Sequence, residues 1–377
     1  MKVRLSFGRA AAVAAGAVGA AGLTFATVGA GVAPAGDHHP TTVLYTMSDA
    51  SAAQGGNAVL GFASQPSGGF SPLGSFSTGG NGSGAGLGSQ GALALAGGGG
   101  WLLAVNAGSN SVSAFRIGDG GALALVNTAS SGGTDPISVS VHGRLVEVLD
   151  AGSSSISGLR LGDGGLSPLT GPGDTASLSR EASSPEQISF TPDGRRVIVT
   201  EKGSDTIDTF EVSGDGNLGE AVATTATGAG PYGFDFDSRG RPIVSDAAED
   251  AATSYRLDRD GTLDAISDVP NGGQAAPCWL VVGGDDAYTA NAHVGTISAY
   301  EISESGQLTL LASVAATAGG IPNLDLTIAQ RTLYNLVPGA NRIVAAPILD
   351  GGALGPVSTA ASSLPSTATG LVSTSVR

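Results

Sequence analysis

Apolar and polar positions along the chain repeat in a unit of strands and turns that returns about every 45 residues from Trp101 onward. Within a unit, a short alternating strand is followed by a tight turn, a mostly apolar second strand and a third strand with a period near two. A proline opens most units, at Pro136, Pro185, Pro231, Pro277 and Pro322. Four short strands in a unit of this length predict one blade of a β-propeller.

The two ends of the chain supply one further unit between them. Residues 42–73 contain a second and a third strand and a closing turn, but no first strand. The apolar residues 370–374 resemble the missing first strand. We therefore predict an all-β, seven-bladed β-propeller with four antiparallel strands per blade, closed by the C-terminal strand in blade one, because closure protects the sheet edges.

The N-terminal residues have the features of an export signal. Lys2, Arg4 and Arg9 precede an apolar stretch that ends in the small-residue motif of Ala33-Pro34-Ala35. We expect a secretory signal peptide over residues 1–35, a short tail over 36–40 and a single propeller domain over 41–377. The protein is then secreted, the alternative being an uncleaved anchor, and no membrane span follows the cleavage site.

The charge balance restricts the partners. The formal net charge is −15, with 17 Lys and Arg against 32 Asp and Glu. Such an acidic surface repels phosphate backbones, so we expect no nucleic-acid partner.

The single cysteine, Cys278, is expected to be a core residue. We expect a monomer without a cofactor, whose partner is a small-molecule ligand or an extracellular partner.

The residues that follow the second strands are the main candidates for a site. They are polar in six units: Asn106, Asp150, Glu201, Asp246, Asn291 and Asn335. Since equivalent positions of a propeller lie on one face, these side chains could bind a polar ligand or a cation such as calcium, or raise one another's pKa. The alternative is that they hydrogen-bond the backbone of the next turn. Among the histidines, His293 has the best claim to a functional face, because it lies in the loop after Asn291.

The sequence of residues 86–91 matches the spacing G-x-G-x-x-G. It follows a stretch of Gly and Ser rather than a strand, and no helical pattern comes after it, so the βα context of a dinucleotide site is missing. We interpret this segment as a flexible loop.

The stretch from Pro185 to Gly194, continuing to Glu201, resembles the seven-bladed propeller lactonase family, which includes 6-phosphogluconolactonases and 3-carboxymuconate lactonizing enzymes. In that family the stretch usually begins Pro-Arg-His, and a Glu ends the next strand. Glu201 matches the family Glu, whereas Glu186 and Gln187 stand in place of the Arg and the His. The resemblance implies the fold and only part of the catalytic set.

Two functions follow as hypotheses. The first is hydrolysis of an uncharged lactone, with Glu201 as the general base and His293 assisting proton transfer. The second is a non-catalytic propeller that binds an extracellular partner or ligand through Asn106, Asp150, Asp246 and Asn291. A short distance between Glu201 and His293 would favour the enzyme, and a wide separation would favour binding.

Overall fold

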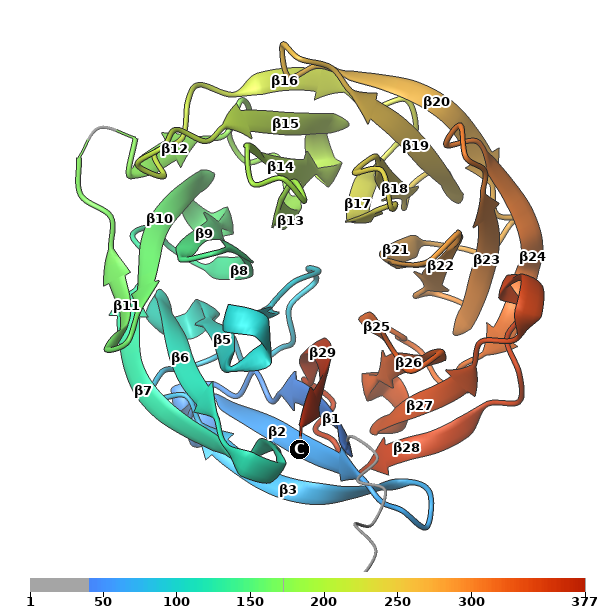
Figure 1. Ribbon diagram of the computed structural model, residues 1–377, viewed down its shortest axis with the longest axis horizontal. Helices are drawn as coiled ribbons and strands as arrows, with labels where there is room; N and C mark the ends of the chain where they lie inside the picture. The colour runs from blue at the N-terminus through green and yellow to red at the C-terminus, as the bar shows by residue number, and fades with distance from the viewer. Residues whose placement is uncertain (1–40, 172, 377) are drawn as a thin grey trace, which may run out of the picture. The chain divides into compact units, whose positions relative to one another are not determined.

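The computed structural model describes residues 41–171 and 173–376, which form seven antiparallel sheets arranged as a ring (Figure 1). Six of the sheets have four strands, and the third has a fifth short strand beside β10. The prediction of a seven-bladed propeller is therefore confirmed. The expected signal peptide and tail, residues 1–35 and 36–40, lie outside the described residues.

The blades are numbered in chain order from the one that contains β1. Blade one consists of β29 (Thr369–Val376), β1 (Thr41–Met47), β2 (Ala58–Ser64) and β3 (Phe70–Ser77). Blade two consists of β4 (Leu93–Ala96), β5 (Trp101–Asn106), β6 (Ser111–Ile117) and β7 (Leu123–Ser130). Blade three consists of β8 (Pro136–His142), β9 (Leu145–Asp150), β10 (Ser155–Gly162), β11 (Gly165–Pro168) and β12 (Thr175–Ser177).

The remaining blades follow the same order from the innermost to the outermost strand. Blade four consists of β13 (Pro185–Phe190), β14 (Arg196–Glu201), β15 (Thr206–Glu211) and β16 (Val222–Thr225). Blade five consists of β17 (Pro231–Phe236), β18 (Pro242–Asp246), β19 (Ala251–Leu257) and β20 (Leu263–Pro270). Blade six consists of β21 (Pro277–Gly283), β22 (Asp286–Asn291), β23 (Thr296–Ile302) and β24 (Leu308–Thr317). Blade seven consists of β25 (Leu326–Ala329), β26 (Thr332–Val337), β27 (Arg342–Pro347) and β28 (Ser358–Ser362).

The helical elements of the described residues are single 3-10 turns, most of them in the connections after second strands. They are η1 (Ala52–Gln54), η2 (Gly97–Gly99), η3 (Ala107–Ser109), η4 (Asp119–Gly121), η5 (Ala151–Ser153), η6 (Lys202–Ser204), η7 (Pro338–Ala340) and η8 (Asp350–Gly352). In the part of the chain that the structure describes, no helix has the length and apolar character needed to span a bilayer.

The ring closes as the sequence predicts. Strand β29 pairs with β1 in an antiparallel register that places Ser373 opposite Leu44. Leu371 of β29 is buried and belongs to the same hydrophobic cluster as Leu44 of β1. The two ends of the described chain thus complete one blade, which closes the ring and leaves only the short sheet edges of a propeller.

Tyrosine hydroxyls connect neighbouring blades at their outer turns. Tyr45 of blade one donates a hydrogen bond to the carbonyl oxygen of Gly121 in blade two, at 2.6 Å. Tyr288 of blade six makes the same contact with Gly352 in blade seven, at 2.9 Å. Both rings are fully buried. The burial of their aromatic surface and the hydrogen bonds of their hydroxyls together stabilise the packing of neighbouring blades.

The first strand of each blade has two ends, which define the two faces of the propeller. At its starting end it lies beside the last residue of the second strand, as Pro185 pairs with Glu201. At its turn end a tight turn connects it to the second strand, as at Thr191 to Gly194, where Gly194 has a φ of 69°. A side chain at this φ is strained, which explains the glycine of the predicted Pro-Asp-Gly turn.

Candidate functional site

The polar residues that end the second strands turn their side chains back into their own blades. Asn106 donates from Nδ2 to the hydroxyls of Ser111 at 3.3 Å and Ser113 at 2.8 Å. Asn291 donates in the same way to Thr296 at 3.0 Å and Ser298 at 2.9 Å. The partners lie five and seven residues further along the chain, because the second strand pairs with the third in the same register in both blades. We call this the brace position of a blade.

The acidic members of the series occupy the same position. Asp246 accepts a hydrogen bond from the Thr253 hydroxyl at 2.6 Å, and Asp150 lies against Ser157 and Ser131. Burial raises the pKa of Asp246 to about 8 and that of Asp150 to about 6. All four predicted ligand-binding residues, Asn106, Asp150, Asp246 and Asn291, are completely buried and lie in four different blades. Asn106, Asp246 and Asn291 hydrogen-bond side chains of their own blades, whereas both carboxylate oxygens of Asp150 are buried without a hydrogen-bond partner among the described residues.

The assignment of Asn335 to this series is wrong by two residues. In blade seven the last residue of the second strand is Val337, which pairs with Arg342 and precedes η7. Asn335 lies two residues before Val337, on the same face of the strand. It donates instead to the carbonyl oxygens of Leu324 and Asp325. The apolar Val337 was missed because the sequence series was built from polar residues.

Glu201 holds the brace position of blade four, where its partner seven residues later is also acidic. Its carboxyl lies against the Asp208 carboxyl and close to the hydroxyls of Ser183 and Ser179. Oε2 of Glu201 and Oδ1 of Asp208 are both buried without a hydrogen-bond donor among the described residues. Burial, followed by the contact with Asp208, raises the pKa of Glu201 to about 8. A proton shared between the two carboxyls would satisfy both orphan oxygens.

The second predicted catalytic residue, His293, is not part of this cluster. It lies in the connection between β22 and β23 of blade six and its side chain is exposed. Blade five separates it from Glu201, and within residues 41–171 and 173–376 no hydrogen bond or ion pair joins the two side chains. The structure therefore does not bring the predicted pair together.

The connection between β3 and β4 runs into the centre of the ring (Figure 1). We call its residues 86–91 the central loop. Gln90 donates from Nε2 to the carbonyl oxygen of Leu280 at 2.8 Å and accepts from the Leu280 amide at 2.9 Å. The Trp279 indole donates to the carbonyl oxygen of Ser89 at 3.0 Å, and the Gln90 amide donates to that of Glu186. The expectation of a flexible loop is wrong, because this segment is bonded to the first strands of blades four and six.

A buried ion pair lies beside the central loop, at the starting ends of the first strands. Glu186 forms the pair with Lys202, and the Tyr232 hydroxyl donates to the same carboxylate. The Glu186 side chain is 5% exposed, whereas that of Lys202 is 40% exposed. Burial raises the pKa of Glu186 to about 7, although the Lys202 and Tyr232 contacts act in the opposite direction. A carboxyl that titrates near neutral pH can exchange protons with a substrate.

Two further side chains, Trp279 and Cys278, complete what we call the Glu186 cluster. The Tyr232 ring packs against Trp279 at 5.1 Å and lies 4.9 Å from the Lys202 ammonium. Cys278, buried as predicted, lies near Glu186 and Lys202, and burial raises its pKa to about 12. The thiol is therefore protonated at neutral pH and is a poor nucleophile.

The remaining family position, Gln187, has a structural contact. Its Nε2 donates to the carbonyl oxygen of Phe234 at 2.9 Å, and its Oε1 accepts from the Phe234 amide at 2.7 Å. This two-point contact joins the first strands of blades four and five. Sequence reasoning identified the loss of the family Arg and His at Glu186 and Gln187 but missed Lys202, which directly follows Glu201 and returns a cation to this end of the strands.

The chain's carboxylates do not assemble into a metal centre: among the described residues, no three His, Cys, Asp or Glu side chains lie close enough together to hold an ion. The brace carboxylates are distributed over blades three, four and five. The cation alternative for the brace series thus has no shared site in this arrangement.

Residues 81–243 match the family model described as lactonase, 7-bladed beta-propeller. A comparison with curated proteins found no match. Among solved structures, a putative 6-phosphogluconolactonase from Bacteroides fragilis is 19% identical, with a TM-score of 0.69, over 91% of this chain and 100% of that chain.

Two further solved structures share the propeller. The periplasmic gluconolactonase of Pseudomonas aeruginosa is 16% identical, with a TM-score of 0.69, over 89% of this chain and 100% of that one. Virginiamycin B lyase from Staphylococcus aureus is 14% identical, with a TM-score of 0.52, over 73% of this chain and 84% of that one. At such identities the likeness concerns the fold, which supports different chemistries in these proteins. The seven blades thus show the propeller fold, and residues 81–243 are similar to the seven-bladed lactonase family.

Proposed function

We propose that the protein hydrolyses an uncharged lactone at the Glu186 cluster. The observation that carries the proposal is the buried Glu186 carboxyl, which Lys202 and Tyr232 contact, at the place where the lactonase pattern has its arginine. Burial raises the pKa of this carboxyl to about 7. The family match supports the reaction class. This assignment replaces the pair of Glu201 and His293 as the first choice, because those side chains lie in blades four and six without contact.

In the proposed reaction, the Glu186 carboxylate accepts a proton from a water molecule, whose oxygen attacks the lactone carbonyl carbon. The carbonyl oxygen becomes an oxyanion, which the Lys202 ammonium stabilises. The oxyanion then collapses, the ring C–O bond breaks, and the leaving oxygen takes the proton from Glu186. The product is a hydroxy acid, and Glu186 returns to its carboxylate form.

The charge of the cluster favours a neutral substrate. Its one cation, Lys202, is already paired with Glu186, and Asp325 adds a buried carboxyl near Tyr232 whose pKa burial raises to about 7. A phosphorylated or carboxylated lactone would need a further cation at this position. We also propose export, on the basis of the basic and apolar N-terminal sequence and its Ala33-Pro34-Ala35 motif.

The central loop favours a second candidate, a binding propeller without catalysis. Gln90 occupies backbone hydrogen-bonding groups of Leu280 in the middle of β21, and Leu87 and Ser89 are buried. A substrate would have to enter beside this loop, where Lys202 is exposed. If no space opens there, the face of the propeller at the starting ends of the first strands can bind a ligand or partner only on its surface.

Acid release in a pH-stat, measured with a panel of neutral sugar and aliphatic lactones, tests the proposal. We expect hydrolysis by the mature protein and a loss of roughly a hundredfold or more in Glu186→Gln, since removal of a general base has effects of this size. Lys202→Met should also lower kcat, because it removes the charge that stabilises the oxyanion. The rate should rise as the pH passes through about 7, where Glu186 loses its proton.

Glu201→Gln and Arg180→Gln serve as the comparison variants. Arg180 is exposed in the connection before blade four, so its substitution should leave the rate unchanged. If Glu201→Gln abolishes hydrolysis and Glu186→Gln does not, Glu201 is the general base, as the sequence predicts, and the assignment of Glu186 is wrong. If no lactone is hydrolysed although circular dichroism shows an intact fold, the protein is not a lactonase for these substrates and the non-catalytic binding function is favoured.

A further inference from the structure

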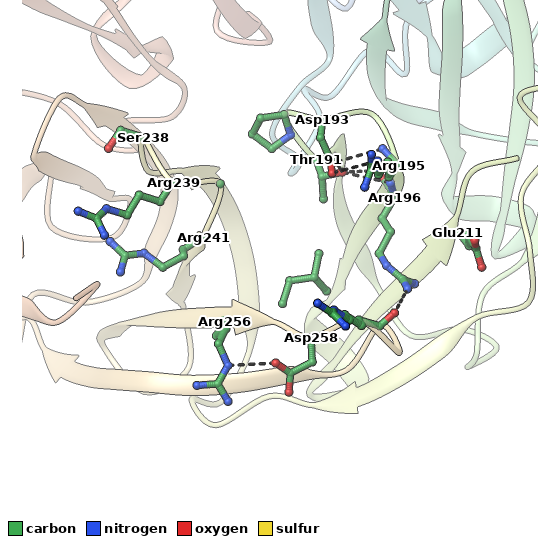
Figure 2. Close-up of a pocket in the computed structure, with 14 residues that line it drawn as sticks. Thr191, Asp193, Arg195, Arg196, Glu211, Ser238, Arg239, Arg241, Arg256 and Asp258 are labelled. Atoms are coloured by element: carbon green, nitrogen blue, oxygen red, sulfur yellow. Dashed lines mark hydrogen bonds and ion pairs between the residues drawn. The ribbon is translucent and has the colours of Figure 1, made fainter. Parts of the chain in front are cut away.

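Six arginines surround one hollow at the turn ends of blades four and five. They come from the turn and second strand of blade four, the turn of blade five and the end of β19. Figure 2 shows Arg195 and Arg196 on one side of the space and Arg239 and Arg241 on the other. The residues are Arg195, Arg196, Arg239, Arg241, Arg256 and Arg259. The hollow has a volume of about 780 Å³, within the usual range for small-molecule sites.

This concentration of positive charge contrasts with the rest of the chain. The protein has 17 Lys and Arg in total and a formal net charge of −15. The hollow is lined by six Arg and by three acidic residues, Asp193, Glu211 and Asp258, and three further carboxylates pair with its arginines from outside the lining: Asp237, Asp264 and Glu304. Attraction of an anion therefore depends on the guanidinium groups that keep free donors, and not on net charge alone.

Two of the arginines are already committed to carboxylates. Arg241 donates from Nε to Asp237 at 2.6 Å, and its other nitrogens bind the carbonyl oxygens of Glu304 and Ser303. Arg256 binds Asp258 at 3.0 Å and Asp264 at 2.6 Å. These residues shape the wall of the hollow, and their donors are already occupied, so the other four arginines give the sharper test.

The other four guanidinium groups retain free donors. Arg196 donates to the backbone carbonyl oxygen of Arg259 and has no ion pair among the described residues. Arg195 and Arg239 have only loose ion pairs of 3.8 Å, with Asp193 and Glu304. The Arg259 side chain is exposed and makes no ion pair or hydrogen bond within the described part of the chain. Planar guanidinium groups with free donors bind phosphate and carboxylate groups in a bidentate manner.

We propose that this hollow binds a small organic polyanion, with two or more phosphate- or carboxylate-type groups. A single anionic group would compete with Asp193 and Asp258, whereas several groups can engage the arginines of blades four and five together. Pro192 and Leu257 provide apolar wall that suits a short carbon skeleton. The site lies at the opposite ends of the strands from Glu186, so it does not depend on the proposed hydrolysis.

Isothermal titration calorimetry at low ionic strength, about 0.01 M, tests the proposal with tripolyphosphate as the phosphate probe and citrate as the carboxylate probe. We expect one binding site for at least one probe, and the stronger of the two identifies the preferred anionic group. The combined substitution of Arg239→Gln and Arg259→Gln should raise Kd about tenfold or more, because each charge-assisted hydrogen bond contributes substantially to affinity. Added salt should weaken the binding further.

Arg180→Gln is the control, because it removes one positive charge, half the number that the double variant removes, from an exposed side chain in the connection that enters blade four at its starting end. It should leave Kd within about twofold if binding is local rather than a response to net charge. The thermal midpoint without ligand should be the same in all variants, which verifies the fold. No heat with either probe, or an equal loss of affinity in Arg180→Gln and in the double variant, would overturn the proposal.

Discussion

At the brace position, blade six has a neutral network and blade four an acidic one. Asn291 donates to Thr296 and Ser298 and accepts from Asn271 at 3.3 Å, so its amide is saturated. Glu201 faces Asp208, and each carboxyl keeps one oxygen without a donor. The strand pairing around the two residues is the same. Equal backbone geometry thus supports two different chemical states.

The difference shows what the brace position does. Its side chain connects the end of the second strand to the third strand, and a neutral amide does this at any pH. Glu201, whose partner on the third strand is the Asp208 carboxyl rather than a hydroxyl, can do so only while a proton is shared between the two carboxyls. Blade four therefore has a pH-dependent form of a contact that is constant in blade six.

The largest effect is expected from Asn291→Ala. The substitution removes two buried hydrogen bonds to Thr296 and Ser298 and leaves their hydroxyls without this donor, which should lower the free energy of unfolding by about 2–3 kcal/mol. Urea denaturation followed by circular dichroism measures the change. His293→Ala, two residues further and exposed, is the control and should change stability by less than about 0.5 kcal/mol. Equal effects of the two substitutions would mean that the brace is not structural.

Glu201→Gln should remove the pH dependence of blade four. The pKa of Glu201 is raised from 4.5 to about 8 in the folded protein. Its contribution to stability is therefore fully present below pH 4.5 and is lost as the pH rises through about 8. Relative to the parent protein, the variant should gain roughly 2 kcal/mol between pH about 5.5 and about 9.

Denaturation curves of both proteins at the two pH values give this difference directly. Glu147 and Asp246, whose pKa values burial raises to about 8, contribute to the pH dependence of both proteins and cancel in the comparison. Parallel changes of stability with pH in the two proteins would show that Glu201 has an ordinary pKa.

A smaller effect is expected from Asp208→Asn, which makes the brace of blade four resemble that of blade six. The amide can donate to Glu201 and still accept from the Ser179 backbone N–H, which now binds Asp208 at 2.7 Å. Removal of the neighbouring carboxyl should lower the pKa of Glu201, because that contact raises it. We expect the pH-dependent loss of stability to shrink by about 1 kcal/mol, while burial keeps part of the shift. An increased loss would contradict a shared proton.

Much of the architecture followed from local pattern. The strands at residues 145–149, 206–210 and 296–300 lie within β9, β15 and β23, because alternation of apolar residues is fixed by the two faces of a sheet. The prediction that the C-terminal strand completes blade one is also confirmed. The error at Asn335 arose because residue type was used in place of register, and only the pairing of Val337 with Arg342 corrects it.

The sites depended on contacts between residues far apart in the chain. Nothing near Gln90 in the sequence indicates that it binds Leu280, 190 residues away. Glu186 was noticed through the family pattern, but its pairing with Lys202 and Tyr232 depends on how blades four and five are packed.

By itself, then, the sequence determined the repeat, the number of blades and the closure of the ring, because hydrophobic periodicity and turn residues act over a few neighbouring positions. The tertiary structure alone decided which polar residues meet. It distributed the brace residues among separate blades, placed the central loop against Leu280 and gathered six arginines into one hollow. Burial and charge at these places depend on distances across the ring, which no local pattern encodes.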